Sequence, residues 1–296
     1  MQNAFPGTPS PARVVIWEKR DGALDAPGVR QAIDDLRATA GDGVLGEPIS
    51  EARVGRALVL RVPLADFGTG DTANRALATL RSRTLPAAFG HVGGIDYAVA
   101  GKTALAYDFT EQLSSRTPLV FGFVLVLAFV LLAVAFRSIA VALVSIALNL
   151  LSIGAACGVL TWVFQDGHLG SVLGFTSYGG IVDWLPVFMF VILFGLSMDY
   201  HIFILSRIRE RRSDGAAPRD AIIGGIGGSA GVVTSAAVIM TAAFSVFVVL
   251  TAIEYKMMGV GLSVAILIDA TLVRGVLLPA ALALLGDRAW GRDRPE

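Results

Sequence analysis

The sequence predicts an α+β membrane protein, in which a ferredoxin-like βαββαβ domain precedes a bundle of five membrane-spanning helices. Of its 296 residues, 54% are hydrophobic, and the mean hydropathy of +0.68 is far above that of a soluble globular protein. From Pro118 onward, apolar stretches long enough to cross a bilayer follow one another. Residues 1–117 instead alternate β-type runs with amphipathic helical patterns. These observations divide the chain into a soluble domain and a membrane domain.

The first domain, residues 1–117, has the predicted element order β-α-β-β-α-β. Its runs of β-branched residues predict strands, and its apolar residues at helical spacing predict helices. The strands are expected at 12–18, 44–52 (the weakest), 56–64 and 95–101, and the helices at 27–39 and 71–85, the second ended by Pro86. A further helix at 103–116 leads into the membrane. A ferredoxin-like topology supports many unrelated functions, so it indicates no activity by itself.

The second domain, residues 118–286, contains five predicted spans. They cover residues 118–136, 139–164, 185–206, 228–250 and 257–278, and a tail follows at 287–296. Short loops rich in Lys and Arg stay in the cytoplasm. Arginines concentrate at Arg137, in the loop 207–222 and in the tail, whereas the loop 165–183 has no Lys or Arg.

This charge pattern predicts a multi-pass protein of the cell (inner) membrane with an extracytoplasmic domain 1–117 and a cytoplasmic C-terminus. Export of that domain requires a preceding helix, so we expect the chain to be a fragment or one part of a split protein. The competing, inverted topology would place the arginine loop outside, against its charge.

The composition gives no support for several function classes. Lys+Arg and Asp+Glu both number 24, so net charge offers no argument for binding nucleic acid. The three histidines are scattered, and no Gly-x-Ser-x-Gly nucleophile elbow occurs. We therefore expect no enzymatic activity, no metal, no cofactor and no nucleic-acid partner.

Asp199 is the main candidate functional residue, because it is a carboxylate inside the apolar span 185–206. An ionised Asp at mid-membrane costs at least about 2.5–3.5 kcal/mol, so such a residue usually faces a helix bundle and holds or passes a proton. The alternative is a carboxylate near the lipid interface that merely finds a polar partner. Tyr200 carries a hydroxyl that could relay the proton, although consecutive helical residues point about 100° apart.

Four further polar residues in the spans allow two interpretations each. His201 titrates readily, but an interhelical hydrogen bond is the alternative to a relay role. Asp269 is either one partner of a structural ion pair, with Arg274 or another helix, or a second proton site. Arg274 follows it by five residues, beyond ideal i,i+4 geometry. Asn149 suits an interhelical hydrogen bond better than a transport role.

The stretch 195–210, Gly-Leu-Ser-Met-Asp-Tyr-His-Ile-Phe-Ile-Leu-Ser-Arg-Ile-Arg-Glu, resembles the MMPL (mycobacterial membrane protein large) family of the resistance–nodulation–division (RND) transporter superfamily. Residues 136–138, 147–152 and 268–274 support the resemblance. Family members have two similar halves, each with one helix, a porter domain and five more helices. The chain resembles the second half without its first helix.

The resemblance implies export of lipids or other hydrophobic compounds, driven by the proton gradient. Asp199 and Tyr200 match the family's Asp-Tyr proton-relay pair, and protons would be the coupling ion. The implied partners are the missing N-terminal half, in the same or a separate chain, and a lipid or hydrophobic substrate; an oligomer is compatible with this. The alternative is a non-transporting RND-like protein that senses lipids or sterols or assists translocation, in which Asp199→Asn would affect only stability and lipid binding.

Overall fold

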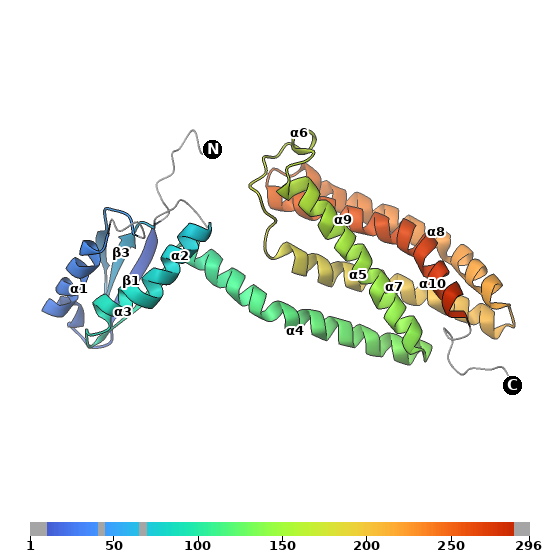
Figure 1. Ribbon diagram of the computed structural model, residues 1–296, viewed down its shortest axis with the longest axis horizontal. Helices are drawn as coiled ribbons and strands as arrows, with labels where there is room; N and C mark the ends of the chain where they lie inside the picture. Colours follow the sequence, from blue (N-terminus) through green and yellow to red (C-terminus); the bar gives the residue numbers. More distant parts are fainter. Residues whose placement is uncertain (1–10, 41–44, 65–69, 287–296) are drawn as a thin grey trace. The chain divides into compact units, whose positions relative to one another are not determined.

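The computed structural model describes residues 11–40, 45–64 and 70–286 (Figure 1), and the predicted tail 287–296 lies outside these residues. The chain divides into two compact units between Ser114 and Ser115. The first unit contains the sheet and its helices, and the second contains the helical bundle.

The first unit is built on a four-stranded antiparallel sheet. Its strands are β1 (Ala12–Glu18), β2 (Ser50–Val54), β3 (Ala57–Val62) and β4 (Ile95–Ala100), in the order β2-β3-β1-β4. Alternation decides which side chains are buried: Val14 and Ile16 are inside, and Arg13 is exposed. The weakest predicted strand begins later than expected, at Ser50, because Pro48 cannot donate a ladder hydrogen bond.

Three helices supply the rest of this core. They are α1 (Pro27–Ala38), α2 (Asp71–Thr79) and α3 (Leu85–Phe89), and their buried residues include Leu36, Leu77 and Phe89. The prediction that Pro86 ends a helix is wrong. A π-helical turn at Leu80–Thr84 joins α2 to α3, and Pro86 lies in the first turn of α3, where its missing N–H is tolerated.

Five helices of the described residues are long and apolar enough to cross a membrane, as predicted. They are α4 (Lys102–Phe136), α5 (Ile139–Leu160, continued to Gln165), α7 (Leu185–Ser213), α8 (Pro218–Ser245, continued to Val249), and α9 (Ile253–Ile268), which runs through a π-helical segment η5 (Asp269–Leu277) into α10 (Leu278–Leu285). Each extends beyond its predicted span at one end or both: α4, α7 and α8 continue with stretches that contain charged residues, and α10 adds the apolar residues 279–285.

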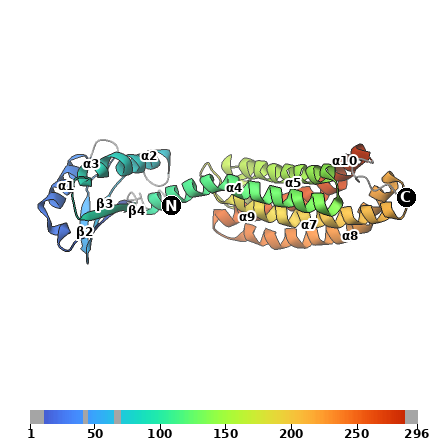
Figure 2. The ribbon, with the colours of Figure 1, turned by 90° about the horizontal axis from the view of Figure 1, so that it is seen from below.

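Helices α5, α7, α8 and α9 pack side by side in the bundle (Figure 2). Helix α4 is mostly exposed and contacts the bundle through rings such as Phe121, stacked on Phe190 with 3.8 Å between ring centroids. The short helix α6 (Gly170–Leu173) lies in the loop before α7. Its end is held by the buried Lys256 of α9, whose ammonium donates to the carbonyls of Leu173 and Gly174.

Candidate functional site

A buried ion pair joins Asp269 and Arg274 inside the bundle. Their side chains are 9% and 6% exposed, so both charges are almost fully removed from solvent. The π-helical backbone of η5 accounts for the spacing, because it bonds residue i to residue i+5 and brings side chains five apart onto nearly one face. The expected ion pair between Asp269 and Arg274 is therefore present, and the objection that five residues exceed helical geometry does not apply to this segment.

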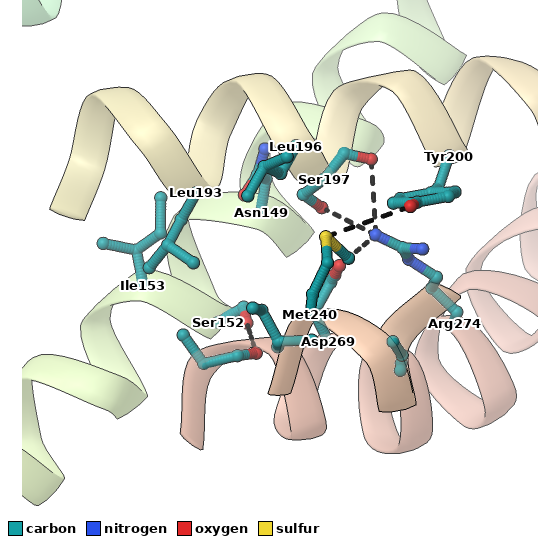
Figure 3. A pocket seen from close by; sticks show the side chains of 14 residues that line it. Asn149, Ser152, Ile153, Leu193, Leu196, Ser197, Tyr200, Met240, Asp269 and Arg274 are labelled. Atoms are coloured by element: carbon teal, nitrogen blue, oxygen red, sulfur yellow. Dashed lines mark hydrogen bonds and ion pairs between the residues drawn. The ribbon is translucent and has the colours of Figure 1, made fainter. Parts of the chain in front are cut away.

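The ion pair borders a cavity of about 20 Å³ between α5, α7, α8, α9 and η5 (Figure 3). Its polar lining consists of Asn149, Ser152, Ser197, Tyr200, Asp269 and Arg274. Two buried oxygens of this lining, Asn149 Oδ1 and Asp269 Oδ1, have no hydrogen-bond partner among the described residues. The cavity volume exceeds the about 10–15 Å³ that a polar cavity needs to hold a water molecule.

Tyr200 lies at the junction of three elements. The guanidinium carbon of Arg274 is 4.6 Å from the centroid of its ring, which is the geometry of a cation–π contact. Its hydroxyl points to the sulfur of Met240 in α8, at 4.0 Å. Arg274 also donates to the carbonyl and hydroxyl oxygens of Ser197, both at 3.5 Å. The ring thus contacts the fifth span, and its hydroxyl contacts the fourth.

Asp199 lies elsewhere, and the expectation that it faces the interior of this bundle is wrong. It is exposed on α7, in one strip with Val191 and Gly195, whereas Met198 and His201 are buried. It does not line the cavity, and no hydrogen bond or ion pair of its side chain occurs among the described residues. The physical reason is the 100° step of the helix, which turns Asp199 outward when its neighbours turn inward.

His201 and Asn149 form hydrogen bonds of different kinds. Nδ1 of His201 lies 3.0 Å from the carbonyl oxygen of Ser197, one turn earlier in its own helix, so its hydrogen bonds do not join two helices. Its buried Nε2 has no partner among the described residues. Asn149 donates through Nδ2 to the carbonyl of Phe194, at 3.4 Å, which confirms the predicted interhelical hydrogen bond.

The structure thus gathers Tyr200, Asp269, Arg274 and Asn149 at one cavity and leaves Asp199 on the surface. Sequence reasoning missed Ser197 and Met240. Ser197 offered a signal, since a hydroxyl one turn before a histidine in an apolar span is a natural partner for it. Met240 offered none. Among the described residues, no group of three or more His, Cys, Asp or Glu side chains could hold a metal ion.

Five apolar helices with a buried ion pair and an acid on an apolar helix surface define a multi-pass membrane protein with ionisable groups in its membrane domain. The chain belongs to the MMPL family, whose sequence model matches residues 1–296. The matched residues include both structural units.

Three relatives illustrate the similarity. The mycolic acid-containing lipids exporter MmpL11 of Mycolicibacterium smegmatis is 37% identical over 292 residues, which cover 98% of this chain and 30% of that protein. The heme uptake protein MmpL11 of Mycobacterium tuberculosis H37Rv is 37% identical, with the same coverage. The trehalose monomycolate exporter MmpL3 of Mycobacterium tuberculosis CDC 1551 is 34% identical over 75% of this chain and 23% of that protein. The chain thus spans less than a third of the length of each.

Proposed function

We propose that this chain is the C-terminal portion of a transporter that uses the proton-motive force to export lipids or other hydrophobic compounds across the inner membrane. Membership of the MMPL family supports a transport role, and two of the three relatives are named as lipid exporters. A proton that crosses about 100 mV supplies about 2.3 kcal/mol, so several protons per cycle would drive the export of a large amphipathic molecule.

The observation that carries this proposal is the exposure of Asp199 on an apolar helix. An ionised carboxylate that faces acyl chains is costly, so a face of this kind is normally covered by protein or reached by water. We propose that the N-terminal half of the transporter, in the same or a separate chain, covers this face. Asp199 would then load and release a proton at the boundary between the halves, and Tyr200 would assist from the adjacent position.

The first unit would be the extracytoplasmic porter domain of that transporter. Its strand order, β2-β3-β1-β4, and its element order support the ferredoxin-like description. The arginines between α7 and α8 support a cytoplasmic position for that loop and for the C-terminus. With a cytoplasmic C-terminus and five spans, residues 1–117 would lie outside, which agrees with a porter role.

The experiment is proton-dependent substrate efflux by the complete transporter with Asp199→Asn. Asparagine keeps the size of the side chain and cannot titrate, so we expect transport to be lost while the protein still accumulates in the membrane. Asp166→Asn, exposed in the loop before α7, is the matched control and should transport normally. Undiminished proton-dependent efflux by Asp199→Asn would rule the mechanism out.

Two other outcomes would redirect the proposal. If Asp199→Asn changes only stability and lipid binding, the non-transporting, lipid-sensing alternative replaces it. If substrate accumulates inside rather than leaving, the direction is uptake, which is the activity in the name of one relative.

A further inference from the structure

Tyr200 adjoins the carboxylate of the proposed relay, yet its ring is held by a residue from another span. Arg274 lies 74 positions later in the sequence, on η5. Its guanidinium carbon lies over the Tyr200 ring, 4.6 Å from the ring centroid, and Met240 contacts the hydroxyl at the other end of the side chain. These two contacts restrict the orientation of the ring.

Arg274 can hold this position because its charge is balanced. Asp269 pairs with it, and Ser197 accepts two further hydrogen bonds from the same nitrogen. A single buried guanidinium would be strongly unfavourable in this apolar environment, whereas the pair with its hydrogen bonds is tolerated. The π-helical backbone of η5 is what allows Asp269 to reach Arg274. π-helical turns are frequent at functional sites.

We propose that Arg274 is a positioning residue: its guanidinium, balanced by Asp269, fixes the ring of Tyr200, the residue that follows Asp199 in the sequence. This inference rests on the proposed relay function for its consequence in transport, but the contact itself can be tested without any transport measurement. A planar guanidinium stacks on a ring face and a compact ammonium does so less well, so arginine and lysine are not equivalent here.

The test places 3-fluorotyrosine in the complete transporter and follows the ¹⁹F resonance of residue 200, assigned by its disappearance in Tyr200→Phe. We expect Arg274→Lys, which keeps the charge beside Asp269, to shift and broaden this resonance. Arg219→Lys, at the exposed start of α8, is the matched control and should leave it unchanged. An unaltered resonance in Arg274→Lys would overturn the proposal.

Transport provides a second readout. Loss of the contact should slow proton-dependent transport roughly two- to thirtyfold, which corresponds to the usual strength of a cation–π contact. In a Tyr200→Leu background, Arg274→Lys should cause no further decrease, because the ring that it positions is absent. Equal decreases in both backgrounds would mean that Arg274 acts on something other than Tyr200, and would also overturn the proposal.

A second variant allows the same test if Arg274→Lys does not fold. Asp269→Asn with Arg274→Gln removes both buried charges together and leaves no unpaired ion. We expect the same change in the residue-200 resonance, and an unchanged resonance would again contradict the proposal. If Tyr200→Leu itself transports normally, the relay role of Tyr200 fails, while the resonance still decides whether Arg274 positions the ring.

Discussion

At the scale of single residues, burial separates the two acids of the membrane domain. The side chain of Asp269 is 9% exposed and paired with Arg274, whereas Asp199 is exposed on the surface of α7. A buried pair contributes little to stability as a unit, but loss of one partner leaves an uncompensated charge. The two acids should therefore respond differently to neutralisation.

Asp269→Asn should destabilise the membrane domain by about 3–5 kcal/mol, because the buried Arg274 loses its counter-charge. Denaturant unfolding of the complete protein in detergent micelles measures the change. The double variant Asp269→Asn with Arg274→Gln should recover most of the loss. A single variant as stable as the wild type would show that the pair is not what satisfies Arg274. Asp199→Asn, at an exposed position, should change the stability much less.

Ion pairs on the first unit predict that its folded state becomes less stable at acid pH. The pKa of Asp25 is lowered by its hydrogen bond with the Arg53 guanidinium, and that of Asp96 is lowered by its hydrogen bond with Lys19. Because both carboxyl groups have lower pKa values in the folded state, their stabilisation is complete above about pH 4, the unfolded value, and is lost as the pH falls through the folded values.

Urea unfolding followed through Trp17 measures this effect, because Trp17 pairs in register with Asp96. For this measurement the other three tryptophans of the full chain, at positions 162, 184 and 290, are replaced by Phe, so that Trp17 is the only tryptophan left. We expect the urea concentration at the midpoint of unfolding to be lower at about pH 3 than at neutral pH. In the variant Asp25→Asn with Asp96→Asn, this decrease should be smaller. Equal decreases with and without these carboxylates would refute the assignment.

At the scale of elements, glycines decide how closely α7 and α8 approach. A Cβ at Gly225 would lie 2.5 Å from Ile208 Cγ1 and 2.9 Å from the Ile208 backbone nitrogen. Contacts this short do not occur between real atoms, so the helices touch only because Gly225 has no side chain. The glycine-rich start of α8, which the sequence shows at 224–231, is therefore part of a helix contact at this position.

Gly225→Ala should destabilise the bundle by about 1–3 kcal/mol, because α7 and α8 must separate to admit the methyl group. Gly227→Ala is the matched control on the same helix, since nothing lies within 4 Å of its added Cβ. Alanine there should be neutral or stabilise the helix by up to about 1 kcal/mol. Thermal unfolding of both variants gives the comparison, and equal effects would mean that the helices do not approach as described.

At the scale of the whole molecule, the exposed strip of α7 raises the question of what covers it. Gly195 lies one turn before Asp199 in this strip, and nothing lies within 4 Å of a Cβ added there. If the other half of a transporter packs against this strip, the open space beside Gly195 is where its side chains lie. If lipid covers the strip, a larger side chain at position 195 would meet no protein there.

Gly195→Trp should abolish transport by the complete protein, because a large side chain at a packed interface usually costs about 1–3 kcal/mol and displaces the partner helix. Leu143→Trp, on α5, is the control, because Leu143 is 55% exposed and its replacement adds another apolar side chain to the surface. Substrate efflux, normalised to the amount of protein in the membrane, checks the outcome. Normal transport by Gly195→Trp would argue against a protein partner on this strip.

Sequence patterns predicted the five membrane-spanning helices and the family, because length, hydropathy and the motif around Asp199 are local properties of the chain. They also predicted strand β1 with its observed bounds. The prediction that Pro86 ends a helix was wrong because a proline is tolerated in the first turn of the next helix. The direction in which Asp199 faces was misjudged because a single acid in an apolar span does not reveal the side to which its helix packs.

Which polar residues meet depends on how the helices pack, and the sequence did not predict it. The π-helical backbone of η5 brings Asp269 to Arg274, and Arg274 reaches α7, where it bonds Ser197 and lies over the ring of Tyr200. Such contacts depend on helix rotation and backbone geometry, which hydropathy does not encode. The local pattern determined that these helices exist, and their packing determined which charges share a cavity.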